Sequence, residues 1–159
     1  AADILAPTDL HQLSVRTSMY TYNCIIKRIV DGDTIDVDID LGFDTWLHNQ
    51  RVRLYGIDAP ETRTRNLTEK YYGELATYFV SNQLLVGERY VLRSREFNPT
   101  DAFGRILGDI LLEDGCSITD VLLESHHAVH WNPDNREGMA QQHIANQRIL
   151  AEQGYKPEE

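Results

Sequence analysis

The stretch IVDGDTIDVDIDL, residues 29–41, decides the fold. Its second half alternates strictly between apolar residues and aspartates, from Ile35 to Leu41. A period of two indicates a strand with one buried face and one acidic outer face. The preceding Asp31-Gly32-Asp33-Thr34 has the composition of a turn, and the apolar positions that lead into it from Tyr22 indicate another strand. The stretch therefore predicts two strands joined by a turn that carries carboxylates.

Strand and helix patterns follow one another along the rest of the chain. Asn66 or Thr68 can cap a helix whose apolar residues fall at helical spacing up to Leu84, and Gly87 ends it. Ser117 opens a segment that resembles a capping box. The remaining expected elements are a loop at 42–50, strands at 51–55, 90–92 and 106–112, a helix to about His126, and a last helix from the Asn132-Pro133 turn through Arg148.

This order of elements predicts a mainly β domain of the α+β class. It suits a five-stranded oligonucleotide/oligosaccharide-binding (OB) barrel with about three helices packed on it. Residues 22–159 are expected to form this one domain, because 159 residues bury one sizeable core with little room for a second. Residues 1–21 show no clear periodicity and are expected to form an N-terminal arm. Periodicity alone does not give the order of the strands in the barrel.

The distribution of charge bears on the partners of the chain. A net charge of -10 at pH 7 argues against a general nucleic-acid coat. The middle third, residues 51–105, is net basic, whereas both flanking thirds are acidic. This pattern indicates that phosphate is handled in the middle third, although surface charge also varies along ordinary chains. No apolar run approaches the ~18 residues of a membrane-spanning helix, so no membrane partner is expected.

Two further features bear on the cellular setting. The first residues, AADILAPTDLHQL, have neither the basic start nor the continuous apolar stretch of a secretory signal. Cys24 and Cys116 are the only cysteines, and we expect them to be two free thiols. Both features favour an intracellular protein. A mature secreted form whose signal has already been removed is the alternative.

Acidic residues close two of the expected strands. They lie in Asp31-Gly32-Asp33-Thr34 and in Ile57-Asp58-Ala59-Pro60-Glu61. If the two strands are neighbours in a barrel, the turns present Asp33 and Asp58 together to a hard cation such as calcium, which takes carboxylate and carbonyl oxygens. Ile35 occupies the third ligand position of an EF-hand loop, so the first turn is not such a loop. The alternative is a pair of ordinary Asp-rich turns.

Two arginines accompany the acidic turns. Arg53 lies on the strand that leads into the second turn, and Arg105 follows Gly104. A guanidinium can hold phosphate through two parallel hydrogen bonds and keeps its charge at any working pH. Two of them near a cation would neutralise a phosphodiester in its transition state. The alternative is that each is a surface arginine in an ion pair.

The segments IVDGDTIDV, VRLYGIDAPET, EKYYGELA and DAFGRIL, in this order, resemble the staphylococcal-nuclease (thermonuclease) family. The resemblance runs from about Tyr22 to Tyr155, which is most of the chain. It implies an OB barrel that cleaves DNA and RNA with calcium (Ca2+) and leaves 3′-phosphate and 5′-hydroxyl ends. Single- or double-stranded DNA or RNA is therefore the expected partner, and the sequence indicates no particular protein partner.

The same resemblance divides the site into metal ligands and catalytic groups. Asp33 and Asp58 would be the carboxylate ligands, and the carbonyl of Ala59 would be a further ligand. Asp31 would support the site through water, and Thr34 would lie beside it. The groups that act on the substrate would be Glu61, as general base or orienter of the attacking water, and Arg53 and Arg105, which would grip the phosphate.

The chain departs from the family where substrate is gripped. The family's lysine-tyrosine pair before Gly-Arg is Ala102-Phe103 here, so the hydroxyl that grips phosphate is missing. A tyrosine that packs on the substrate base corresponds to Val129, with Trp131 two residues on in place of a second tyrosine. Phe103 and Trp131 offer flat faces on which bases can stack, and burial in the core is the alternative.

Other charged side chains have less specific patterns. Arg63 and Arg65 form a basic lip beside the second acidic turn, which contacts the nucleic-acid backbone or is simply solvated. The histidines at 126, 127 and 130 have the spacing of a zinc or nickel site, but solvated or hydrogen-bonded histidines fit a helix end better. The same interpretation applies to His143 on the last helix.

Three hypotheses follow from these patterns. The first is a calcium-dependent endonuclease that does not discriminate between the sugars of DNA and RNA. The second is a catalytically weak or inactive barrel that binds nucleic acid or protein in a larger assembly, which the acidic charge and the Ala102-Phe103 replacement favour. The third is a calcium-binding structural protein, which would have no use for the two arginines.

Overall fold

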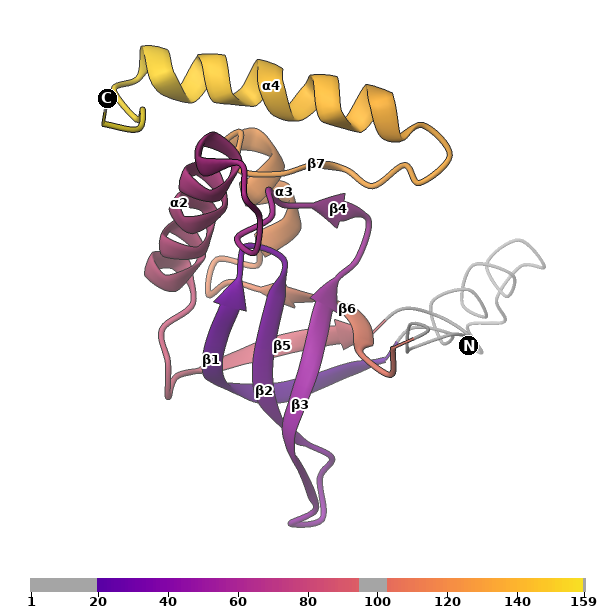
Figure 1. Ribbon diagram of the computed structural model, residues 1–159. Coiled ribbons are helices and arrows are strands. Elements are labelled where there is room, and N and C mark those ends of the chain that lie inside the picture. The colour runs from indigo at the N-terminus through magenta and orange to yellow at the C-terminus, as the bar shows by residue number, and fades with distance from the viewer. Residues whose placement is uncertain (1–19, 95–102, 159) are drawn as a thin grey trace, which may run out of the picture.

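The centre of the molecule is a closed five-stranded barrel with strand order β1-β2-β3-β6-β5 (Figure 1). The computed structural model describes residues 20–94 and 103–158. All neighbouring strands are antiparallel except β3 and β6, which run parallel and close the barrel. The barrel strands are β1 (Thr21–Asp31), β2 (Thr34–Asp40), β3 (Trp46–Leu54), β5 (Arg89–Ser94) and β6 (Ile106–Leu111).

Three helices and a small second sheet gather around the barrel in the part of the chain that the structure describes. The helices are α2 (Leu67–Gln83), α3 (Ile118–Glu124) and α4 (Arg136–Glu152). The second sheet pairs β4 (Ile57–Asp58) with β7 (Val129–His130) in antiparallel fashion. Figure 1 shows α4 lying across one end of the molecule, beyond β4 and β7. These observations confirm the predicted α+β barrel with three helices.

The alternation in β2 builds the core as predicted. Ile35, Val37 and Ile39 are at most 3% exposed and point into the barrel. The aspartates point outward, but they are paired with neighbouring side chains rather than simply solvated. Asp36 receives two hydrogen bonds from the Arg51 guanidinium, at 2.9 and 3.2 Å. Alternation therefore predicts which face is buried, while the partners of the outer face depend on the neighbouring strand.

Asn66, one of the two residues predicted to cap α2, is the N-cap of this helix. The Asn66 side chain accepts hydrogen bonds from the backbone N–H groups of Thr68 and Glu69, which satisfies two otherwise unpaired donors of the first turn. The helix buries Tyr72, Ala76 and Val80 along the face that packs on β1. This packing matters for function because the loop that enters α2 carries Glu61.

Several predicted boundaries are wrong. Strand β3 begins at Trp46, so the predicted loop at 42–50 is a strand over its second half, with exposed polar residues that hide the pattern. Helix α4 continues four residues beyond Arg148, to Glu152. Ser117 stands at the N-cap of α3 but makes no side-chain cap hydrogen bond, because its hydroxyl donates to the buried carboxylate of Asp109.

Other predictions concern the N-terminal arm, the two cysteines and membrane-spanning helices. Of the predicted arm, residues 1–19 lie outside the described residues, and Thr21 already belongs to β1. Ala102 also lies outside the described residues. Cys24 is buried and Cys116 is exposed, and both are free thiols, as expected. Between residues 20 and 94 and between 103 and 158, no helix combines the length and the apolar character that crossing a bilayer requires.

Candidate active site

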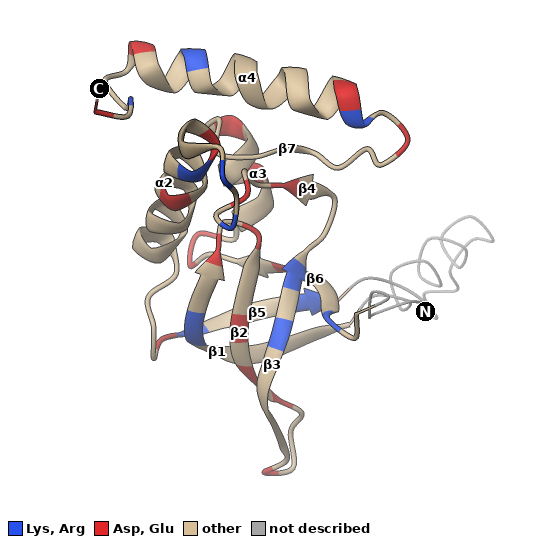
Figure 2. Ribbon diagram, in the orientation of Figure 1, with Lys and Arg blue, Asp and Glu red and all other residues tan. Residues whose placement is uncertain are grey.

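The two acidic turns meet at the end of the barrel that faces α4. Figure 2 shows acidic residues at the β1–β2 turn and in β4, near the entry to α2. Gly32 permits this meeting, because a Cβ atom there would lie 2.8 Å from Cβ of Ala59 and 2.9 Å from Cβ of Ala76. The first turn therefore packs directly against the second turn and against α2. A small residue at position 59 suits this close approach.

Asp33 holds the two turns together. Its side chain is almost buried, with the residue 9% exposed. One carboxylate oxygen, Oδ1, accepts a hydrogen bond from the Thr34 hydroxyl at 3.0 Å, and Oδ2 accepts one from the backbone N–H of Ala59, also at 3.0 Å. The backbone carbonyl of Asp33 accepts a further hydrogen bond from the N–H of Leu54 at 2.8 Å. These bonds fix the orientation of the carboxylate.

Asp58 approaches the same place from β4. Its backbone pairs with Val129 of β7. Its Oδ1 lies 3.5 Å from Nη2 of Arg53, and its Oδ2 lies 2.9 Å from Nε2 of His143, a residue of α4. The second sheet and α4 thus determine where this carboxylate points.

Arg53 joins the two carboxylates. Its Nη2 lies 3.4 Å from Oδ2 of Asp33 and 3.5 Å from Oδ1 of Asp58, while its Nη1 donates to the carbonyl of Leu54 at 2.9 Å. The guanidinium lies 5.8 Å from the centre of the Trp131 ring, which is within range of a cation–π interaction. The side chain is 13% exposed. Two carboxylates on separate turns therefore converge on one positive group.

Asp31 shares the first turn with Asp33, and its Oδ1 accepts the backbone N–H of Asp33 at 3.1 Å. Burial, together with the side chain and the charge of Asp33, raises the pKa of Asp31 to about 7. A low-polarity setting with a second carboxylate disfavours two negative charges. Added positive charge at this turn would favour the ionised pair.

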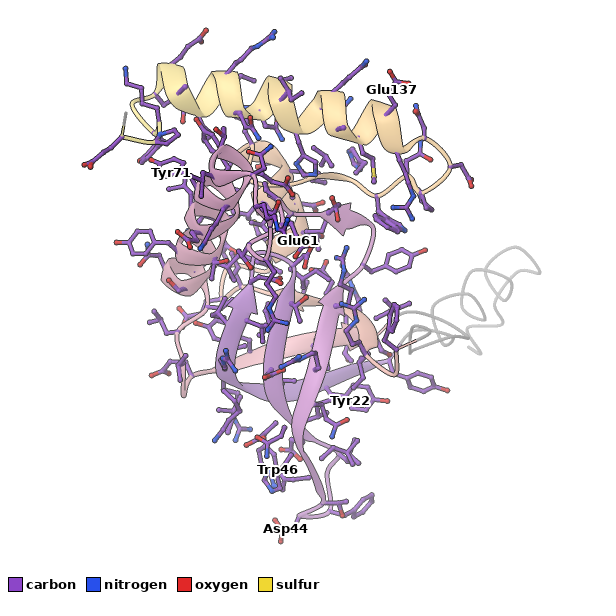
Figure 3. All side chains as sticks on the ribbon, viewed as in Figure 1. Tyr22, Asp44, Trp46, Glu61, Tyr71 and Glu137 are labelled. Carbon is purple, nitrogen blue, oxygen red and sulfur yellow. The ribbon has the colours of Figure 1, made fainter. Side chains whose placement is uncertain are left out.

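Glu61 follows Pro60 in the loop between β4 and α2. A Cβ atom at Gly73 would lie 2.7 Å from the carbonyl oxygen of Pro60 and 2.9 Å from that of Glu61, so α2 fixes this backbone by direct contact. Partial burial raises the pKa of Glu61, and the charges of Asp33 and Asp58 add to this effect. Figure 3 shows Glu61 between the end of the barrel and α4. A carboxylate with a raised pKa is a stronger base than an ordinary one.

The two predicted phosphate-binding arginines line one cleft of about 750 Å³. The Arg105 guanidinium lies 5.5 Å from the centre of the Phe103 ring, and Phe103 is 84% exposed. A neighbouring cleft of about 420 Å³ is lined by residues that include Asp58 and Glu61. Trp131 and Arg136 line both clefts, so they stand between the arginine side and the carboxylate side of the site.

The basic lip and the histidines near position 127 lie outside these two clefts. Arg63 and Arg65 are exposed and line neither cleft. His127 is buried with its ring centre 4.5 Å from that of Phe79 and the two rings tilted to each other, and burial lowers its pKa to about 4. Within residues 20–94 and 103–158, no three His, Cys, Asp or Glu side chains gather in a way that could hold a metal ion. The spacing of the histidines at 126, 127 and 130 therefore does not produce a metal cluster.

Two residues of the site were not singled out by the sequence. The sequence predicts only an ordinary solvated or hydrogen-bonded histidine at position 143, and no pattern distinguishes Arg136. Both lie on α4, and each reaches the site only because that helix docks over β7. Local pattern gives no sign of this docking, so only a tertiary contact could have identified them.

Comparison with known proteins identifies relatives of this chain. A family described as "Staphylococcal nuclease homologue" matches residues 51–155. The chain is 33% identical over 132 residues to Thermonuclease of Staphylococcus intermedius, covering 83% of this chain and 68% of that protein. It is 27% identical over 128 residues to Endonuclease YhcR of Bacillus subtilis, covering 76% of this chain and 10% of that protein. It is 39% identical over 85 residues to Protein ParB of Escherichia coli, covering 54% of this chain and 39% of that protein. The chain thus spans less than half of the length of YhcR and ParB.

Proposed function

The chain belongs to the staphylococcal nuclease family, and on that premise we propose that it is a calcium-dependent endonuclease. It would hydrolyse phosphodiester bonds of DNA, RNA or both and leave 3′-phosphate ends. One observation carries the proposal: Asp33 and Asp58 converge on Arg53, at 3.4 and 3.5 Å, beside a cleft that Arg105 also lines. This arrangement supports the proposal, because carboxylates that would hold a cation lie next to guanidinium groups that would hold a phosphate.

The donor atoms suit calcium. Asp33, Asp58 and the carbonyl of Ala59 would hold the ion, and all three supply the hard oxygen ligands that calcium prefers. The carboxylates of Asp33 and Asp58 already face a common positive group, the Arg53 guanidinium, so positive charge is favoured at their meeting point. When bound, the ion would supply Lewis-acid polarisation of a phosphoryl oxygen. Two carboxylates and one carbonyl make an open site, so we expect modest affinity.

The remaining residues would perform the hydrolysis. Glu61, whose pKa is raised by burial and by Asp33 and Asp58, would accept a proton from the attacking water. The water oxygen would form a bond to phosphorus as the bond to the 5′-oxygen breaks, and that oxygen would leave with a proton from solvent. Arg53 and Arg105 would stabilise the negative charge that develops on the phosphoryl oxygens.

A binding module without catalysis is the competing proposal. It is favoured by the net charge of -10 and by the Ala102-Phe103 replacement of the family's lysine-tyrosine pair. Phe103 cannot donate a hydrogen bond to phosphate. The chain would then retain nucleic acid in the cleft without cutting it, and calcium would change affinity but not produce fragments.

A cleavage assay separates the two proposals. Single-stranded DNA and RNA are incubated with the protein in calcium and in excess chelator. We expect fragments only with calcium, and fragments whose 5′ ends accept label from a polynucleotide kinase without phosphatase treatment, because they carry 5′-hydroxyls. Binding without fragments would favour the module. Fragments that need phosphatase before labelling would contradict the proposed 3′-phosphate products.

A further inference from the structure

His143 of α4 reaches the carboxylate of Asp58 across 85 positions of sequence, with Nε2 at 2.9 Å from Oδ2. An ionised carboxylate only accepts hydrogen bonds, so the ring nitrogen is the donor. The His143 side chain is 16% exposed and the Asp58 side chain 26%, so the bond is partly shielded from water. Its Nδ1 atom is buried and has no hydrogen-bond partner among residues 20–94 and 103–158. The hydrogen bond to Asp58 therefore satisfies the Nε2 atom of this partly shielded ring.

The two carboxylate oxygens of Asp58 have different partners. Oδ2 faces His143, and Oδ1 faces Arg53 at 3.5 Å, on the side where Asp33 also points. Asp33 achieves a fixed orientation through the Thr34 hydroxyl and the Ala59 N–H, both of which come from the turns themselves. Asp58 receives the equivalent restraint from a helix that lies far away in sequence.

The position of α4 is itself fixed near this contact. Nδ2 of Asn146 donates to the carbonyl of Ala128 at 3.2 Å, and the sulfur of Met139 accepts the backbone N–H of Asn132 at 3.1 Å. These bonds lie one helical turn on either side of His143 and attach α4 to the segments that flank β7. The imidazole is therefore presented to Asp58 by a helix that is anchored on both sides of it.

We infer that His143 is a positioning residue, which holds the Asp58 carboxylate so that Oδ1 points to the cation site shared with Asp33. This inference rests on the proposed metal-binding role of Asp58. Hydrogen bonds behind a ligand of this kind commonly change metal affinity by about 10–100-fold. The imidazole is assigned no place among the ligands, because its Nε2 already faces Oδ2 of Asp58 at 2.9 Å. Helix α4 is accordingly part of the active site and not only a cover.

Terbium binding tests this role without relying on activity. Terbium(III) occupies calcium sites, and its luminescence is sensitised by a nearby indole, here Trp131, which lines the same cleft as Asp58. The full chain, freed of metal, is titrated with terbium as the parent protein and as His143→Gln, His143→Asn and His143→Leu. Glutamine can place an amide N–H where Nε2 lies, whereas the shorter asparagine cannot. His130→Gln, at an exposed histidine of β7, is the matched control.

We expect His143→Asn and His143→Leu to weaken terbium binding by about 10–100-fold, while His143→Gln and His130→Gln bind like the parent. Displacement of terbium by calcium should show the same order of affinities. If His143→Leu fails to fold, the comparison of glutamine with asparagine still decides the matter. Equal affinities for the asparagine, glutamine and parent proteins, or equal weakening by glutamine and asparagine, would overturn the inference.

Asp58→Asn separates failure of this inference from failure of the proposed function. If Asp58→Asn weakens terbium binding and the His143 variants do not, the metal site stands and the positioning role is wrong. If Asp58→Asn also binds like the parent, the metal site itself is wrong and the inference fails with it. In the double variant Asp58→Asn, His143→Leu, the second change should add little, because its effect acts through the Asp58 carboxylate.

Discussion

Arg53 and Arg105 line the same cleft, but the structure holds them in different ways. Arg53 ion-pairs with both site carboxylates, donates to the Leu54 carbonyl, and lies against Trp131. The Arg105 guanidinium stacks near Phe103, an exposed neighbour two positions away in sequence. Arg53 thus links two carboxylates from separate turns, whereas Arg105 lies beside an exposed aromatic ring. The comparison teaches that one of the two proposed phosphate-binding arginines also joins parts of the site to one another.

The largest expected effect is on the catalytic rate, and it should be shared by the two arginines. Loss of one group that stabilises transition-state charge typically costs about 10²–10³-fold in kcat. We expect losses of this order for Arg53→Ala and for Arg105→Ala, measured by steady-state cleavage of a short labelled oligonucleotide in calcium. A nearly unchanged kcat for either variant would remove that arginine from the mechanism.

Stability should reveal the linking role of Arg53. In chelator, Arg53→Ala leaves the Asp33 and Asp58 carboxylates without their shared partner, so its free energy of unfolding should fall by about 1–3 kcal/mol. Calcium should restore most of this loss. Arg51→Ala, a control on the same strand whose pair with Asp36 is exposed, should unfold like the parent. Equal stability of Arg53→Ala and Arg51→Ala, measured by urea unfolding, would contradict the linking role.

A smaller effect is expected at Trp131, whose ring lies against the Arg53 guanidinium. Cation–π contacts contribute about 0.5–2 kcal/mol, which corresponds to about 2–30-fold in rate if the contact holds Arg53 in its working position. Trp131→Leu should therefore reduce kcat by that factor, and Trp131→Phe should recover part of it. If only KM changes and kcat is unaffected, Trp131 contacts substrate without positioning Arg53.

Changes at positions 102 and 103 should alter substrate binding more than the catalytic rate. Restoring the family pair with Ala102→Lys plus Phe103→Tyr adds a cation at position 102 and a hydroxyl at position 103. We expect KM to fall severalfold with little change in kcat, because these contacts hold the ground state and the transition state alike. The salt dependence of KM should steepen by about one phosphate contact. Unchanged KM and unchanged salt dependence would show that this loop does not lie on the substrate.

The smallest expected effect concerns the way in which Asp31 makes the stability of the protein depend on pH. Burial, and then Asp33, raise the pKa of Asp31 to about 7, so the native state binds more protons than the unfolded state between about pH 4 and pH 7. Stability in chelator should consequently fall as pH rises through this window. Asp31→Asn removes the effect and should be more stable than the parent at pH 8, where the parent must hold a buried ionised carboxylate. Parallel pH profiles for the two proteins would contradict the assignment.

Much of the fold follows from local patterns because those patterns reflect burial directly. The alternation from Ile35 to Ile39 places its apolar residues inside the barrel, and Asn66 caps α2 with its own side chain. The structure brings Asp33, Asp58 and Arg53 together as the turn motifs suggested. Each of these features depends on a few adjacent residues, so the sequence displays it.

The features that sequence did not predict depend on distant partners. The β4–β7 sheet consists of two-residue strands, which are too short for any periodicity. The first half of β3 is largely exposed and lacks a regular alternation, and it is a strand because β2 pairs with it. The His143 contact arises only when α4 docks, so nothing around residue 143 reveals it. Arg53 and Arg105 likewise look alike in sequence, and only their partners distinguish them.

The most direct test of the central claim is the single-turnover cleavage rate of Glu61→Gln in saturating calcium, compared with the parent. Glu74→Gln, at an exposed glutamate of α2, is the matched control. Glutamine keeps the shape of Glu61 but cannot accept the proton of the attacking water, so we expect the rate to fall by at least about 10²-fold. Glu74→Gln should cleave like the parent, and all three proteins should lose cleavage in chelator. A Glu61→Gln protein that cleaves at the parent's rate, or cleavage by the parent in excess chelator, would contradict the proposed calcium-dependent nuclease site.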